Sequence, residues 1–99
     1  MIDFYLISDE ATKPKNLQGE ALTYVGGLSH DVFYRLQNKG VVGGQYDYYS
    51  DFRWSTIVIQ QLINRTNEVK FKDDFDVGKL LKIINHAQKS NLGLIAYCD

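Results

Sequence analysis

The chain has 99 residues, of which 44% are hydrophobic, 13% aromatic and 23% charged. This composition is typical of one globular domain, so we expect a single domain over residues 1–99 and exclude low-complexity disordered and collagen-like chains. The net charge of -1 lacks the basic field that non-specific nucleic-acid binding needs, and we expect no nucleic-acid partner.

The first part of the chain predicts a strand followed by an exposed connection. Apolar side chains occupy every second position from Ile2 to Leu6, which predicts a strand over residues 2–8. Residues 9–20 contain the only proline and no sustained apolar period, so we expect them to form an exposed connection. Residues 21–25 fit either a short strand or an extended approach to the two glycines that follow.

A first helix is predicted over residues 30–39. The hydroxyl of Ser29 can accept a hydrogen bond from a free amide of the first turn, and Gly40 supplies the left-handed residue that ends the helix. Asp31 and Arg35 have the i,i+4 spacing of a favourable ion pair. The residues expected to face inward are Val32, Phe33 and Leu36.

A second helix is predicted over residues 56–65, because Ser55 can cap it in the same way. Residues 56–59 also have strong strand propensity, so a strand remains the alternative there. The residues expected to face inward are Val58, Ile59, Leu62 and Ile63.

The last third of the chain predicts a short strand at residues 68–72, a helix over residues 76–90 and a final strand after Asn91. The helix has a 3.6-residue apolar period. Three acids lie at its start, where negative charge stabilises the positive end of the helix dipole, namely Asp73, Asp74 and Asp76. We therefore predict an α+β fold in which a small sheet contains the N- and C-terminal strands and packs with about three helices.

The cysteine content and the first residues indicate the cellular setting. Cys98 is the single cysteine and cannot form an intrachain disulfide, which favours a reducing compartment. The chain begins without a positively charged leader, and no apolar run is long enough for a membrane span. We expect a cytoplasmic protein with no membrane partner.

Residues that could carry catalysis or hold a ligand are few. His30 and His86 suggest an alternative function, a small nucleic-acid-processing enzyme or RNA-binding module that uses both. One cysteine and two separated histidines lack a metal-ligand spacing, and we expect no metal and no cofactor. Gly26 and Gly27 before a helix fit either a tight turn or an anion cradle, although neither a Walker lysine nor the dinucleotide glycine spacing is present.

Residues 46–54 are unusual because five of the nine are aromatic. Tyrosines, together with one arginine, are residue types that anchor protein interfaces. The aromatics can also serve to fill a core: if Phe52 and Trp54 point inward, alternation turns Asp51 and Arg53 outward. Stacking on single-stranded RNA is a competing use, but carboxylates stand here where a cationic groove is normal. The predicted partner-binding residues are Tyr46, Asp47, Tyr48, Tyr49, Asp51 and Arg53.

The run from Tyr48 to Trp54 ahead of a helix, with the ending from Gly93 to Asp99, resembles the small bacterial immunity proteins encoded beside polymorphic, contact-dependent or secreted toxins. The resemblance implies a cytoplasmic inhibitor, not an enzyme, that binds one cognate toxin domain and occludes its active site or a surface it needs. Against a nuclease toxin, carboxylates of the aromatic segment would mimic phosphates in a basic cleft. Residues 1–52 hold seven acids and four bases, which allows a locally negative face.

Overall fold

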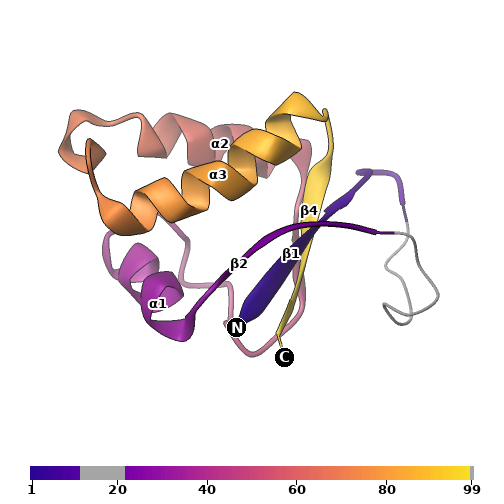
Figure 1. Ribbon diagram of the computed structural model, residues 1–99, viewed down its shortest axis with the longest axis horizontal. Coiled ribbons are helices and arrows are strands. Elements are labelled where there is room, and N and C mark those ends of the chain that lie inside the picture. Colours follow the sequence, from indigo (N-terminus) through magenta and orange to yellow (C-terminus); the bar gives the residue numbers. More distant parts are fainter. Residues whose placement is uncertain (12–21, 99) are drawn as a thin grey trace.

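The structure is a computed structural model that describes residues 1–11 and 22–98; within them it has one four-stranded antiparallel sheet and three α-helices (Figure 1). The strands lie in the order β2-β1-β4-β3, with bounds β1 (Ile2–Ile7), β2 (Thr23–Leu28), β3 (Phe52–Trp54) and β4 (Gly93–Cys98). The helical elements are α1 (His30–Asn38), α2 (Thr56–Thr66), the 3₁₀ turn η1 (Val69–Phe71) and α3 (Phe75–Lys89). Figure 1 shows the helices on one side of the sheet and the two chain ends side by side. The predicted α+β class is confirmed. No helix of the described residues has the length and apolarity to cross a membrane.

Strand pairing decides which side chains face the helices. Phe4 lies opposite Ala96, and Ala96 lies opposite Phe52, so these three side chains form one row across β1, β4 and β3. Trp54 is two residues beyond Phe52 and therefore points to the same face, where it is 1% exposed. Both aromatic residues of β3 thus join the core, as expected from their alternation.

Side-chain caps define the starts of the three helices. Each capping side chain accepts a hydrogen bond from the amide three residues ahead, at 3.3 Å for Ser29, 3.3 Å for Ser55 and 3.0 Å for Asp74. Gly40 follows α1 with φ of 77°, the left-handed conformation expected of a helix stop. Residues 56–59 are helical, so the cap outweighs their strand propensity.

The predicted strand at residues 68–72 is wrong. Val69–Phe71 forms a 3₁₀ turn in which the Phe71 amide donates to the Glu68 carbonyl at 3.0 Å. A strand would place Val69 and Phe71 on one face, but Val69 is 87% exposed while Phe71 is 8% exposed. A single buried anchor is enough for a turn between two helices, and nothing in the sequence distinguished it from a short strand.

The paired glycines lie inside β2, so the prediction of a turn ahead of α1 is wrong. Gly26 is opposite Phe4 with φ of 152°, and a Cβ built on it would lie 3.0 Å from Cγ1 of Ile83. Its missing side chain therefore lets β2 approach α3 closely. The glycine turn on which the anion-cradle alternative depended is therefore not formed.

The segment before β2 is described only in part. Of the predicted connection at residues 9–20, residues 12–20 lie outside the described residues, as does Ala21 of the alternative that was left open at residues 21–25. That open alternative resolves as a strand from Thr23 onward. Asp9 has a defined contact, since its carboxylate accepts hydrogen bonds from the amide and the hydroxyl of Thr56 at 3.0 and 2.6 Å.

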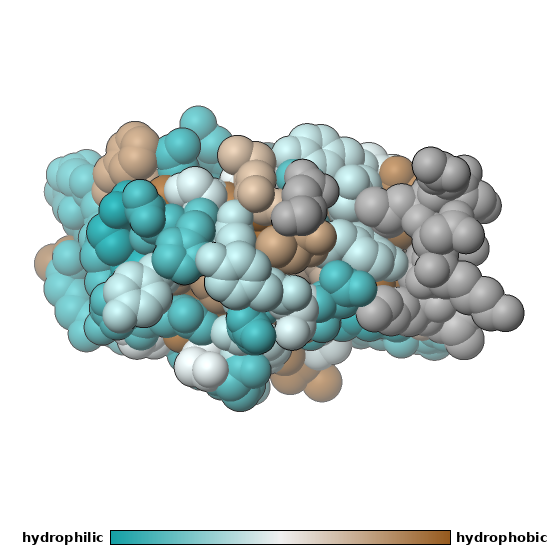
Figure 2. Space-filling view, turned by 90° about the horizontal axis from the view of Figure 1, so that it is seen from below, coloured by the Kyte–Doolittle hydropathy of each residue, from teal (hydrophilic) through white to brown (hydrophobic). Residues whose placement is uncertain are grey.

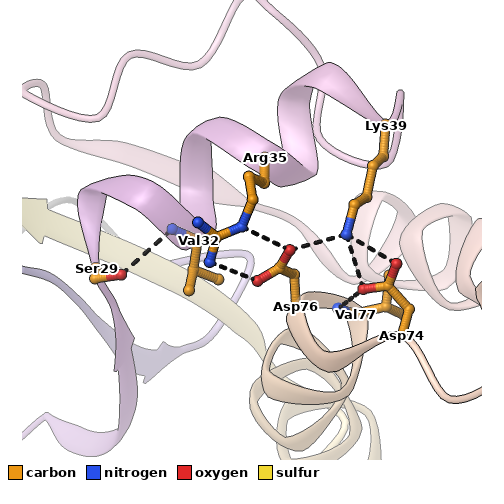
Figure 3. A network of polar contacts seen from close by, with 7 residues as sticks. All are labelled: Ser29, Val32, Arg35, Lys39, Asp74, Asp76 and Val77. Atoms are coloured by element: carbon orange, nitrogen blue, oxygen red, sulfur yellow. Dashed lines mark hydrogen bonds and ion pairs between the residues drawn. The ribbon is translucent and has the colours of Figure 1, made fainter.

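An ion-pair network joins α1 to the start of α3 (Figure 3). Asp76 is 4% exposed and accepts hydrogen bonds from Nε and Nη2 of Arg35 at 2.9 and 3.0 Å, and from Nζ of Lys39 at 2.8 Å. Lys39 also bonds both carboxylate oxygens of Asp74. Arg35 thus pairs across helices with Asp76, where the sequence predicted a pair with Asp31 on its own helix.

The network changes the acidity of its carboxylates. Hydrogen bonds from Arg35 and then Lys39 lower the pKa of Asp76 from 3.8 to about 2, and they outweigh the opposing effect of burial. The pKa of Asp74 is also lowered, first by its hydrogen bond from Lys39 and then by the one from the Val77 amide. Both carboxylates therefore stabilise the folded state as anions.

Replacing Asp76 tests this linkage. The contribution of Asp76 is complete above its unfolded-state pKa of 3.8 and is lost as the pH falls through its folded-state pKa of about 2. Because its partners Arg35 and Lys39 are 48% and 31% exposed, solvent weakens the pairing, and we expect Asp76→Asn to lower the free energy of unfolding by about 1–2 kcal/mol at neutral pH. Urea unfolding at a series of pH values should show the difference shrinking as the pH falls from about 4 towards 2.

Asp31→Asn is the matched control because the Asp31 side chain is 82% exposed. We expect it to change the free energy of unfolding by less than about 0.5 kcal/mol. A pH-independent loss in Asp76→Asn would show that packing, and not charge, is the contribution of Asp76.

Candidate functional site

Four aromatic rings from two separate segments form an exposed cluster. His30 and Tyr34 are one turn apart on α1, with ring centroids 6.1 Å apart and planes 6° apart. Tyr48 and Tyr49 come from the loop before β3 and lie 5.1 and 5.8 Å from the His30 ring. The rings of Tyr48 and Tyr49 are 5.0 Å apart and nearly perpendicular, an arrangement typical of favourable aromatic contacts.

Hydrogen bonds from α1 hold this loop against the helix. The amide nitrogen of the Gln37 side chain donates to the carbonyl oxygens of Gly43 and Tyr46, at 3.2 and 2.6 Å. Asp47 then closes a turn, because its carboxylate accepts hydrogen bonds from the Tyr49 amide at 3.0 Å and from the Ser50 hydroxyl at 3.3 Å. These hydrogen bonds therefore fix the loop that carries Tyr48 and Tyr49.

The cluster combines exposed rings with exposed carboxylates. Tyr34 is 56% exposed and Tyr49 is 71% exposed, while Tyr48 is partly buried against the core. Asp31 projects from α1 with an 82% exposed side chain. We call this set the aromatic–acidic surface and define it as His30, Asp31, Tyr34, Asp47, Tyr48 and Tyr49. Figure 2 views the molecule from the side of α1 and the two chain ends, and shows mainly pale and hydrophilic side chains with small, separate hydrophobic areas.

The other predicted partner-binding residues have different surroundings. Tyr46 is partly buried, and its ring lies 5.0 Å from that of Phe52 and 5.8 Å from that of Trp54. Arg53 points away from the core, and its guanidinium donates to the carbonyl oxygens of Ser8 and Ala11 at 2.8 and 2.6 Å. Asp51 is exposed at the end of the loop. The structure thus brings Asp47, Tyr48 and Tyr49 into one surface, packs Tyr46 beneath it and uses Arg53 to fasten β3 to the end of β1.

The two histidines have separate surroundings. The His30 ring lies against the rings of Tyr34, Tyr48 and Tyr49, and its Nδ1 lies 3.6 Å from a carboxylate oxygen of Asp31. His86 is exposed near the C-terminal end of α3. In residues 1–11 and 22–98, no three or more histidine, cysteine or acidic side chains gather as they would to hold a metal ion.

His30, Asp31 and Tyr34 are members of this surface that the sequence did not assign to it. The i,i+4 spacing of His30 and Tyr34 on a predicted helix was a usable signal that these two share a face. Which face of α1 meets the loop depends on the path of residues 41–46, where Val41 and Val42 are buried and turn the chain back along the helix.

Comparisons with known proteins identify no relative: no family model, no curated protein and no solved structure matches the chain.

Substitutions should separate supporting residues from surface residues within the loop. Tyr46→Ala removes a ring packed on Phe52 and Trp54 and is expected to lower the free energy of unfolding by about 2–3 kcal/mol. Tyr34→Ala and Tyr49→Ala remove exposed rings and are expected to change it by less than about 0.5–1 kcal/mol. Urea unfolding followed by the fluorescence of Trp54 measures all three. A loss in Tyr49→Ala as large as in Tyr46→Ala would make Tyr49 a supporting residue too.

Proposed function

We propose that this chain is a cytoplasmic, non-enzymatic immunity protein that binds a cognate bacterial toxin domain through the aromatic–acidic surface. The observation that carries the proposal is the surface cluster in which the exposed rings of His30, Tyr34 and Tyr49 surround the partly buried ring of Tyr48. The resemblance of residues 48–54 and 93–99 to immunity proteins supports the same function.

The chemistry of the surface suits protein recognition. Tyrosine rings bury large area at low cost in conformational entropy, and their hydroxyl groups can still form hydrogen bonds at an interface. The hydrogen bonds of Gln37 and Asp47 hold the loop in place before a partner arrives. A preorganised loop loses less entropy on binding, which favours a tight complex.

The carboxylates indicate the charge of the partner. Asp31 and Asp47 are exposed within the aromatic–acidic surface, and Asp51 is exposed two residues after Tyr49. A basic toxin surface, such as the cleft of a nuclease, is complementary to these acids and can place arginine side chains over the exposed tyrosine faces. Occlusion of that cleft would block its substrate without any chemistry on the part of this chain.

Binding to the toxin domain encoded by the neighbouring open reading frame tests the proposal. We expect Tyr34→Ala and Tyr49→Ala each to weaken binding by about tenfold or more, because exposed tyrosines at the centre of an interface are frequent hot spots. Val69→Ala is the matched control, since Val69 is 87% exposed on η1 and lies outside the aromatic–acidic surface. Calorimetry on the purified pair gives the affinities, and growth during toxin co-expression gives the protection.

Unchanged affinity in both tyrosine variants would move the interface to another surface. Ribonuclease or hydrolase activity of the purified chain that disappears in both His30→Ala and His86→Ala would contradict the non-enzymatic function itself.

The carboxylates should act mainly on the association rate. Asp31→Asn and Asp51→Asn remove exposed charges, so we expect each to slow association severalfold at low ionic strength and to have little effect at high salt. Stopped-flow or surface-based kinetics at two salt concentrations measures this difference. A salt-independent effect, or faster association, would contradict a basic partner surface.

A further inference from the structure

A groove of about 670 Å³ lies between β2 and the first half of α3. Val25, Gly26 and Gly27 line it from the strand, and Phe75, Lys79 and Lys82 are among the residues that line it from the helix. No residue of the aromatic–acidic surface lines this groove, so it is a separate feature of the molecule.

Small residues keep the groove open and leave an aromatic side chain in it. A Cβ built on Gly78 would meet no atom within 4 Å, so the helix presents free space at that position. Phe75 is 69% exposed, and Nζ of Lys79 lies 5.0 Å from the centroid of its ring. An exposed phenylalanine beside open space offers apolar contact to an incoming side chain.

The strand side of the groove is an open sheet edge. Within residues 1–11 and 22–98, β2 pairs with β1 alone and stands at the end of the strand order. The stretch from Thr23 to Leu28 contains no charged residue and no proline, the residues that commonly protect an exposed edge. Its outer side therefore pairs with no other strand of the described residues.

The helix side carries positive charge. Lys79 and Lys82 are exposed, and neither has an ion pair with a described residue. Asp74 also lines the groove, but Lys39 holds its carboxylate, which leaves the carboxylate of Asp73 beside the two lysines. The charge of the groove therefore complements an acidic segment.

We propose that this groove binds an extended acidic segment of a partner protein, which adds to β2 as a further strand and places its carboxylates beside Lys79 and Lys82. Strand addition supplies affinity through backbone hydrogen bonds, while the groove selects side chains on the face toward the helix. The inference does not rest on the aromatic–acidic surface or on the nature of the toxin.

The probe is a short synthetic peptide in which valine alternates with glutamate, added at millimolar concentration to the ¹⁵N-labelled full chain. We expect chemical-shift changes at the amides of Gly26, Gly27 and Gly78. The double variant Lys79→Gln, Lys82→Gln should bind about fivefold more weakly or worse, which corresponds to loss of about 1 kcal/mol of charge pairing. Val69→Ala, exposed and outside the groove, is the control and should bind as the wild type does.

Two peptide controls separate strand addition from charge attraction. Two peptides are N-methylated at alternate residues, one at the odd positions and the other at the even positions. Each lacks the amide donors along one side of the strand, so the peptide methylated on the side facing β2 should lose binding and the other should retain it. A peptide with lysine in place of glutamate should not bind.

Any of several results would overturn the inference. One is binding that survives in both methylated peptides, another is equal binding of the lysine peptide, and another is no shift change at Gly26, Gly27 and Gly78. The last is a concentration-dependent shift of the β2 amides without any peptide, since a second copy of the chain would then occupy the edge.

Discussion

The packing of Phe52 and Trp54 on Phe4 decides how the aromatic segment is divided between core and surface. The ring centroids of Phe4 and Trp54 are 5.1 Å apart, and those of Phe4 and Phe52 are 6.1 Å apart. With β3 fixed in this way, Arg53 must point to the opposite face and the preceding loop must pass along α1. Tyr48 and Tyr49 therefore owe their position to the inward-facing rings of Phe52 and Trp54, three to six residues away in sequence.

The ion-pair network of Asp76, Arg35 and Lys39 fixes the orientation of α1. Nearly complete burial of Asp76 requires its two cationic partners to stay close, because an unpaired carboxylate in that place is strongly unfavourable. Arg35 and Lys39 lie one turn apart and are both drawn toward the start of α3, which sets the rotation of α1 about its axis. That rotation in turn places His30 and Tyr34 beside the loop.

The groove beside β2 and the aromatic–acidic surface are joined by a continuous stretch of chain that runs from β2 into α1. β2 ends at Leu28, Ser29 caps α1, and His30 begins both the helix and the aromatic–acidic surface. The surfaces differ in chemistry: tyrosines with carboxylates suit a basic partner, whereas an open strand edge with two lysines suits an acidic segment. A partner that engages both would need charges of opposite sign in two places, a pattern that would add specificity.

The sequence by itself determined the class of the fold, the three helices with the caps Ser29 and Ser55 of the first two, and the two strands at the chain ends, because alternation, apolar period and caps are local signals. It also singled out the tyrosines of the loop and the inward course of Phe52 and Trp54. Tertiary structure alone decided that Arg35 pairs with Asp76, that Arg53 fastens β3, and that His30 and Tyr34 join Tyr48 and Tyr49. Each of these contacts links residues far apart in sequence or depends on the rotation of a helix, and no local pattern encodes such distances. The turn at Val69–Phe71 and the place of Gly26 inside β2 were decided in the same way, by what lies across from them in the folded chain.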